Sequence, residues 1–256
     1  MRIPRIYTSQ PLKAGEELAL EERAAHYLGQ VLRMRVSREL VLFNGDGFQY
    51  TAHLTAVDKK HIRCQLGERQ SDTCPPSPLN LTLAIGISKG DRMDWVIQKA
   101  TELGVTAIVP LYTERVDVKL NAQRQEKKQR HWQQVMISAC EQSGRSELVD
   151  IAEPAPLIDW LEHIEKTEPL RLVLHPGSEA DSSSGVDLSS IWQGERPRQV
   201  DVLVGPEGGL DDSEVARCRE LGFHCLQLGP RIMRTETAPL AALSILQYHW
   251  GDMGIW

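Results

Sequence analysis

The sequence lacks the features of a secreted, membrane-spanning or metal-binding protein. Its N-terminus has no apolar segment of signal-peptide length, and no run approaches the roughly eighteen apolar residues of a membrane span. The five cysteines are an odd number without a close CxxC pair, which is typical of reduced cytosolic thiols. No HExxH sequence and no clustered His/Cys set occurs. We therefore expect a cytoplasmic protein without a metal ion.

The common nucleotide-binding and nucleophile motifs are also absent. There is no GxxxxGK[ST] loop, no GxGxxG turn and no GxSxG elbow. What remains is a set of glycine-rich loops, a few arginines and one or two carboxylates. This combination suits a neutral or cationic cofactor that main-chain hydrogen bonds hold, and it does not favour covalent or metal-assisted chemistry.

Length and charge indicate a soluble globular protein with an uneven charge distribution. The 256 residues are 41% hydrophobic and 25% charged, enough for one large domain or two smaller ones. The net charge is −6. Residues 1–74 contribute 11 − 9 = +2 and the remainder contributes 18 − 26 = −8. A mildly basic N-terminal region on an acidic body is weak evidence for a phosphate-bearing partner, because local patches attract phosphate.

The first seventy or so residues have mostly strand-like patterns. Partial alternation marks Leu40–Phe43, Tyr50–Val57 and His61–Leu66, and one short helix is expected near Glu21–Leu32. Three prolines within Cys74–Pro78 indicate a stiff linker. We therefore predict a small β-barrel or sandwich at residues 1–74, followed by a second domain at residues 75–256.

After the linker, strands alternate with helices. Apolar runs predict strands at Leu81–Ile87, Val105–Val109, Leu170–His175, Val200–Val204 and Cys225–Leu228. Helical spacing predicts a helix carrying Met93 to Leu103, helices at about 122–140, 157–164 and 212–221, and a final helix that ends at Trp250. Asp211 and Glu214 form a predicted capping box, and Thr235 or Thr237 is expected to cap the last helix. Such alternation predicts an α/β fold with a mainly parallel sheet and helices on both faces.

Two glycine-rich loops follow consecutive strands near the C-terminus. They are Gly205–Gly209 and Leu228–Ala238. Open α/β sheets bind ligands at the carboxyl ends of their strands. We therefore expect these loops to form one cleft.

These loops carry a family resemblance. The stretches Val204-Gly-Pro-Glu-Gly-Gly-Leu210, Leu226-Gln-Leu-Gly229 and Arg231-Ile-Met-Arg-Thr-Glu-Thr-Ala238 resemble the signature of the SPOUT methyltransferases, and within them the ribosomal RNA small subunit methyltransferase E family. Further matching stretches are residues 1–7, 26–33, 98–105 and 139–145. The resemblance spans nearly the whole chain in the right order. One departure is Ser37-Arg38, which stands where relatives usually have Gly-Asp.

The resemblance implies fold, reaction and partners. It implies a PUA-like RNA-binding β-barrel before a SPOUT domain with a deep C-terminal trefoil knot. The knot rests on the resemblance alone, because ordinary connectivity rules predict an unthreaded sheet. The implied activity is methylation of N3 of a uridine in 16S rRNA of the small ribosomal subunit, with S-adenosyl-L-methionine as cofactor. The implied assembly is a homodimer.

By the same resemblance, three loops bind the cofactor. Their residues are Leu174, His175, Pro176, Gly205, Pro206, Glu207, Gly208, Gly209, Leu228, Gly229, Ile232, Met233, Arg234, Thr237 and Ala238. Glycine permits close backbone approach and positive φ. We expect Leu228, Ile232 and Met233 to line an apolar slot for the adenine ring.

Uracil N3 is a poor nucleophile until its proton leaves. Arg234 is the leading candidate for stabilising the developing anion. Glu207 is the alternative, as a general base. Both have plainer interpretations: Arg234 could pair with Glu236 or Glu214, and Glu207 could bind amides of its own loop.

Basic residues in both domains are candidate RNA contacts. They are Arg5, His26, Arg33, Arg35, Lys89, Arg92, Arg115 and Arg145. A solvated surface is the alternative for each. Two other functions stay open at this point: a methyltransferase of another RNA target, such as a ribose 2′-hydroxyl of tRNA, and a non-catalytic RNA-binding assembly factor.

Overall fold

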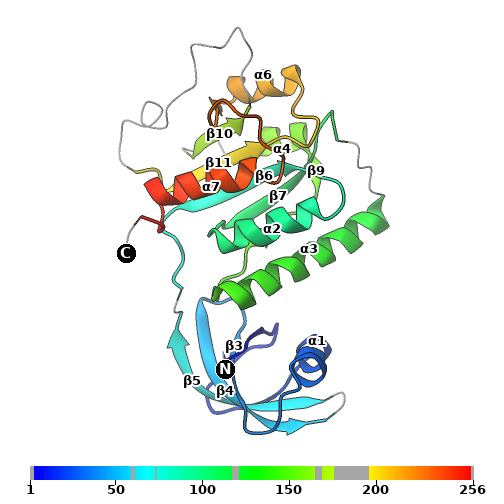
Figure 1. Cartoon of the computed structure of the whole chain (residues 1–256), viewed down its shortest axis with the longest axis vertical. Coiled ribbons are helices and arrows are strands. Elements are labelled where there is room, and N and C mark those ends of the chain that lie inside the picture. The colour runs from blue at the N-terminus through cyan, green and yellow to red at the C-terminus, as the bar shows by residue number, and fades with distance from the viewer. Residues whose placement is uncertain are drawn as a thin grey trace. The chain divides into compact units, whose positions relative to one another are not determined.

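The computed structural model describes residues 3–58, 61–72, 74–116, 121–164, 169–175 and 196–254 (Figure 1). The chain forms two compact units. The first comprises residues 1–76 together with residues 137–148, and the second comprises residues 77–136 and 149–256. Most of the stretch between the predicted strands Leu170–His175 and Val200–Val204 lies outside the described residues.

The first unit is built on a five-stranded sheet. Its order is β1-β3-β4-β5-β2, in which β1 and β3 are parallel and the other neighbours are antiparallel. The strands are β1 (Arg5–Tyr7), β2 (Glu17–Ala19), β3 (Glu39–Phe43), β4 (Phe48–Val57) and β5 (Ile62–Ser71). The predicted β-rich N-terminal domain is thus confirmed, while its closure into a barrel stays a prediction.

The helix predicted near Glu21–Leu32 is present in two parts. It begins as α1 (Glu22–His26) and continues as the π-helical turn η1 (Tyr27–Val31). Leu28 of this turn is fully buried in the core of the unit, with Leu42 and Leu54 of the sheet. The helix therefore covers the apolar side of the sheet.

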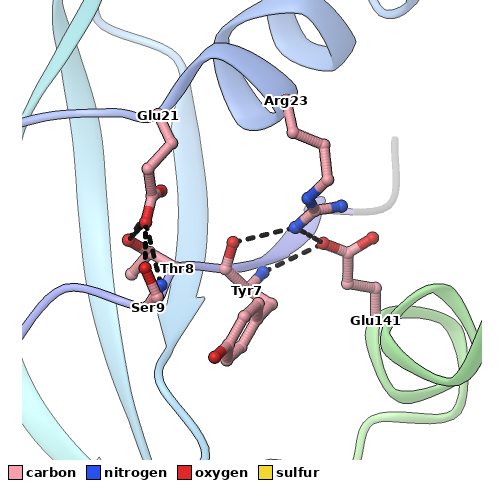
Figure 2. Close-up of polar contacts among 6 residues, drawn as sticks. All are labelled: Tyr7, Thr8, Ser9, Glu21, Arg23 and Glu141. Atoms are coloured by element: carbon pink, nitrogen blue, oxygen red, sulfur yellow. Dashed lines mark hydrogen bonds and ion pairs between the residues drawn. The ribbon is translucent and has the colours of Figure 1, made fainter. Parts of the chain in front are cut away.

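Two carboxylates hold the chain that leaves β1 (Figure 2). Oε1 of Glu141 accepts hydrogen bonds from the backbone amide of Tyr7 at 3.0 Å and from Arg23 at 2.8 Å. The same guanidinium donates to the carbonyl of Tyr7 at 2.9 Å. Glu21 holds the two residues that follow β1: it accepts hydrogen bonds from the hydroxyls of Thr8 and Ser9 and from the backbone amide of Ser9. Glu141 lies on the end of helix α3 (Ala122–Ser143), which explains why residues 137–148 fold with the N-terminal unit.

The second unit contains a parallel sheet with the order β12-β10-β11-β6-β7-β8, and β9 also pairs with β7. Its strands are β6 (Asn80–Gly86), β7 (Ala107–Tyr112), β8 (Asp150–Ile151), β9 (Ala155–Pro156), β10 (Leu170–Leu174), β11 (Gln199–Val204) and β12 (His224–Leu226). Every pairing is parallel. The predicted α/β class is therefore confirmed. Two-residue strands such as β8 and β9 show no periodicity and were not predicted.

Helices cover both faces of this sheet (Figure 1). They are α2 (Arg92–Glu102), most of α3, α4 (Leu157–His163), α6 (Asp212–Glu220) and α7 (Ala238–His249). On one face, Leu161 of α4 and Val215 of α6 share an apolar cluster with Val173 and Leu203 of the strands. The helices α2 and α7 pack against each other, and α7 packs on β11. The threading of the knot stays a prediction.

The two predicted helix caps have different outcomes. The Asp211 capping box is present: Asp211 accepts from the amide of Ser213 at 3.1 Å, and its own amide donates to Glu214 at 2.8 Å. Thr237 occupies the N-cap position of α7, but its side chain makes no capping hydrogen bond. The helix starts instead from a turn in which the amide of Thr237 donates to the carbonyl of Arg234.

None of the helices among the described residues has the length and hydrophobicity needed to cross a membrane.

Candidate active site

The candidate site lies where the parallel strands end. In the register of the sheet, Leu174 of β10 is level with Leu226 of β12 and with Val204 of β11. Because all these strands run the same way, the loops that follow them leave the sheet side by side. The amide of His175 also donates to the carbonyl of Leu226 at 3.4 Å. Of the predicted cofactor residues, Pro176 lies outside the described residues.

The Gly205–Gly209 loop needs its glycines for two different reasons. Gly209 has φ +71°, and its amide donates to the carbonyl of Pro206 at 2.8 Å to close a turn. Gly205 and Gly208 are instead crowded. A Cβ added to Gly205 would lie 2.8 Å from the amide nitrogen of Leu210, and one on Gly208 would lie 3.1 Å from Cβ of Arg115. The loop is therefore packed tightly onto its surroundings.

Two neighbours fix this loop across the ends of β6 and β7. A Cβ on Gly86, the last residue of β6, would lie 2.6 Å from both Cδ and N of Pro206. Beyond β7, Arg115 donates to the carbonyl of Gly208 at 3.3 Å and pairs with Asp211 at 3.1 Å. The loop thus lies over the edge of the sheet, where its backbone is close to the neighbouring strand ends.

The Leu228–Ala238 loop is partly exposed. Leu228 and Met233 are half-buried, but the side chain of Ile232 is 92% exposed. The part of the chain that the structure describes therefore leaves Ile232 uncovered, and the predicted adenine slot has two half-buried apolar walls. The carbonyl of Arg234 accepts from the amides of Thr237 and Ala238 at 2.8 and 3.0 Å. This turn leads the loop into α7.

Alternating charges connect the two loops. Nη1 of Arg92, at the start of α2, donates to Oε1 of Glu207 at 2.7 Å. Nε of Arg92 lies 3.9 Å from Oε2 of Glu236, and Oε1 of Glu236 lies 3.9 Å from Arg234. The side chain of Arg234 is 82% exposed. The chain of charges therefore runs from one loop to the other and ends in a guanidinium that faces solvent.

The surroundings of Glu207 reduce its basicity. Partial burial raises the pKa of Glu207, but hydrogen bonds from its own amide, from Arg92 and from the amide of Lys89 more than offset that effect. The net pKa is below the ordinary value, and the Lys89 amide donates at 3.1 Å. At neutral pH the carboxylate is ionised and engaged by donors. Arg234 is the better placed of the two catalytic candidates to stabilise an anion.

The predicted RNA contacts in the first unit fall into two groups. Arg5 hydrogen-bonds to Gln49 and, at 2.9 Å, to Ser146, and it stacks over the ring of Phe43. These contacts join β1 to β4 and to the chain that follows α3. The exposed residues are His26, Arg33 and Arg35 on the helix α1 and the chain after η1.

The other predicted RNA contacts belong to both units. Lys89, Arg92 and Arg115 follow the ends of β6 and β7 in the second unit, where Arg92 and Arg115 are already engaged by carboxylates. Arg145 belongs to the segment 137–148 of the first unit.

Two residues of the site were missing from the sequence-based set. Glu236 was expected only as a possible partner of Arg234, which lies 3.9 Å away, and its nearness to Arg92 depends on the fold. Gly86 is the one glycine in the predicted strand Leu81–Ile87, a pattern that indicates close approach of another backbone. Among the described residues there is no group of three or more His, Cys, Asp or Glu side chains arranged to hold a metal ion.

Comparisons with known proteins identify the class. Residues 75–247 match the family model of the RNA methyltransferase domain, and residues 20–67 match that of the RNA methyltransferase PUA domain. The chain is therefore an RNA methyltransferase by family.

Similar proteins and solved structures show which family of RNA methyltransferases the chain belongs to. Ribosomal RNA small subunit methyltransferase E of Buchnera aphidicola is 32% identical over 98% of each chain, and that of Bacillus subtilis is 31% identical over 94% of this chain and 93% of that protein. Among solved structures, a methyltransferase from Legionella pneumophila in complex with its bound cofactor SAM (38% identical, TM-score 0.88) covers 99% of this chain and 100% of that chain. Ribosomal RNA small subunit methyltransferase E from Neisseria gonorrhoeae, bound to S-adenosyl methionine (36% identical, TM-score 0.88), covers 98% and 100%. The chain belongs to the ribosomal RNA small subunit methyltransferase E family.

Proposed function

We propose that this protein transfers a methyl group from S-adenosyl-L-methionine to N3 of a uridine in the 16S rRNA of the small ribosomal subunit. The observation that carries the proposal is that β10, β11 and β12 end level with one another at one edge of the parallel sheet, in a chain of this family. Residues 1–74 are the proposed RNA-binding domain, and residues 75–256 are the proposed catalytic domain. We place the reaction in the cytoplasm.

The residues at this edge fit such a cofactor. The Gly205–Gly209 loop offers main-chain groups, and Leu228 and Met233 offer half-buried apolar surface for an adenine ring. The carboxylates of Glu207 and Glu236 lie at the same edge, although Arg92 and Arg234 offset their charge, and they can attract a sulfonium cation locally. The cofactor would supply the reactive methyl group, while the loops position it and exclude water. Orientation of this kind can contribute roughly 7–11 kcal/mol to a reaction.

Arg234 is the proposed catalytic residue. Its exposed guanidinium stabilises the negative charge that develops on the uracil ring as the N3 proton passes to solvent water, and the methyl group then moves from the sulfonium sulfur to N3. Glu207 as a general base is the alternative, and the low pKa caused by its donors makes it a weak base. The role of Glu207 that we favour is therefore structural support of the loop.

The RNA contacts are proposed on exposed basic residues. His26, Arg33 and Arg35 would bind phosphate from the N-terminal unit, and Lys89 would do so from the second unit.

A homodimer is the proposed assembly. Three large apolar side chains, Trp95 of α2 and Ile245 and Tyr248 of α7, are exposed on two helices that pack together. A second copy of the chain would cover them. Light scattering coupled to size-exclusion chromatography measures this directly, and a monomer at micromolar concentration would refute it.

One experiment separates the candidate functions. Purified protein is incubated with labelled cofactor and small subunits from a strain that lacks the modification, and the rRNA is digested to nucleosides. Label in 3-methyluridine supports the proposal. Label on a ribose, or only in tRNA supplied as competitor, supports a methyltransferase of another target. Cofactor binding without label in any RNA supports a non-catalytic assembly factor.

A further inference from the structure

Arg92 contacts carboxylates from both glycine-rich loops. It is the first residue of α2, directly after the segment that leaves β6. Its guanidinium donates to Glu207 at 2.7 Å and lies 3.9 Å from Glu236. The first carboxylate belongs to the loop after β11 and the second to the loop after β12. One side chain therefore bridges the two loops through carboxylates that are 29 positions apart in the sequence (236 − 207).

The bridge places a cation between two like charges. Glu207 and Glu236 would repel each other without a cation between them. The other cation near Glu236 is Arg234, whose side chain is 82% exposed and 3.9 Å away, so solvent weakens its effect. The amide of Lys89, three residues before Arg92, also donates to Glu207. Residues 89–92 thus make two hydrogen bonds to Glu207 of the Gly205–Gly209 loop and one ion pair with Glu236 of the Leu228–Ala238 loop.

We propose that Arg92 is a positioning residue that holds these two loops in the spacing that the cofactor requires, and that it is not a phosphate contact for RNA. The inference rests on the proposed assignment of the loops as cofactor loops. A planar guanidinium can serve two carboxylates at once through different nitrogens, whereas the point charge of lysine cannot do so with the same geometry.

The two roles of Arg92 predict different kinetics. A positioning residue affects the KM and Kd of the cofactor and leaves the KM of the small subunit unchanged. Loss of a phosphate contact instead raises the KM of the small subunit and leaves cofactor binding unchanged. It also lowers the slope of log affinity for RNA against log salt concentration by about one.

The test compares Arg92→Ala and Arg92→Lys with a matched control. Arg217 of α6 makes an ion pair with Glu220 at 2.8 Å and has a similar side-chain exposure, 44% against 46% for Arg92, so Arg217→Ala controls for loss of an arginine. Calorimetry gives the Kd of S-adenosylmethionine, and steady-state assays give both KM values. We expect Arg92→Ala to weaken cofactor binding by about five- to tenfold, Arg92→Lys to recover part of the loss, and Arg217→Ala to change it less than about twofold.

A double mutant tests the coupling itself. Once Glu207→Gln has removed the partner charge, Arg92→Ala should cost less than it does in the wild-type background. Unchanged cofactor affinity in Arg92→Ala, with a raised KM for the small subunit, would overturn the proposal. Unchanged values of both would also overturn it. If Arg92→Ala fails to fold, as judged by its melting transition, Arg92→Lys carries the same comparison.

The loop assignment is tested separately with Leu228→Asp. If this variant folds and binds the cofactor as tightly as the wild type, the Leu228–Ala238 loop is not a cofactor loop and the proposed site fails. If Leu228→Asp loses the cofactor while Arg92→Ala does not, the site stands and only the role of Arg92 is refuted.

Discussion

Replacing Arg234 by alanine should separate catalysis from cofactor binding. The side chain is 82% exposed, and its ion pair with Glu236 is long, at 3.9 Å. An exposed pair of this kind contributes little to stability, so the free energy of unfolding should change by less than about 0.5 kcal/mol. Any loss of activity in a folded variant then reports on the reaction.

The size of the catalytic loss follows from the proposed role. Removing one preorganised donor to a developing anion costs roughly 10²–10³ in kcat, or about 2.7–4 kcal/mol. We therefore expect kcat of Arg234→Ala to fall by about this factor at neutral pH. The deficit should shrink as pH rises, because N3 of the uracil then loses its proton without help. Arg231→Ala, at a second exposed arginine of the same loop, is the control and should retain kcat within about threefold.

Two assays decide the outcome. Single-turnover methyl transfer at saturating cofactor reports the chemical step, and calorimetry reports the Kd of S-adenosylmethionine. An Arg234→Ala variant with unchanged single-turnover rate but weakened cofactor binding would refute the catalytic role and make Arg234 a binding residue. If Arg234→Ala changes neither the single-turnover rate nor the Kd of the cofactor, the result would favour Glu207 as the general base that deprotonates N3.

The remaining predictions concern stability. Ser37 has φ +69°, a left-handed conformation that glycine adopts more readily than serine, so Ser37→Gly should raise the unfolding free energy by about 0.5–1 kcal/mol in denaturant titration; a loss would contradict this. Glu141→Ala leaves the Tyr7 amide and Arg23 without their shared acceptor and should cost about 1–3 kcal/mol, whereas Glu141→Gln keeps an acceptor oxygen and should cost less; unchanged stability in Glu141→Ala would contradict this. Gly86→Ala places a Cβ 2.6 Å from Pro206 and should lower stability by about 1–3 kcal/mol and weaken cofactor binding, and an unchanged Kd would refute the close approach.

The sequence was sufficient to predict the class of the fold and the order of most elements. Helical spacing located α2, and the Asp211 capping box located the start of α6, because both signals depend on residues a few positions apart. Glycine and proline after apolar strands also indicated which loops would leave the sheet edge. These are local patterns, and local patterns report local structure.

The arrangement of the elements required the structure. The position of β6 between β11 and β7 has no signature in the sequence, because strand order depends on pairings between residues that are far apart in the chain. The attachment of Glu141 to Tyr7 joins residues 134 positions apart, and that of Arg92 to Glu207 joins residues 115 apart. Such contacts show that Arg5 and Arg92 are engaged within the protein, while a role of either residue in binding RNA stays a prediction. The threading of the knot is likewise a global property, and it remains a prediction from the family.

The central claim is tested most directly in 16S rRNA from a strain that lacks this methyltransferase. Mass spectrometry of its nucleosides is compared after complementation with the wild-type chain and with Arg234→Ala at matched expression. We predict that the wild type restores 3-methyluridine in 16S rRNA and that the variant leaves most of the rRNA unmodified. Restoration of a different modified nucleoside, or no restoration by a wild-type chain that binds the cofactor, would contradict the account.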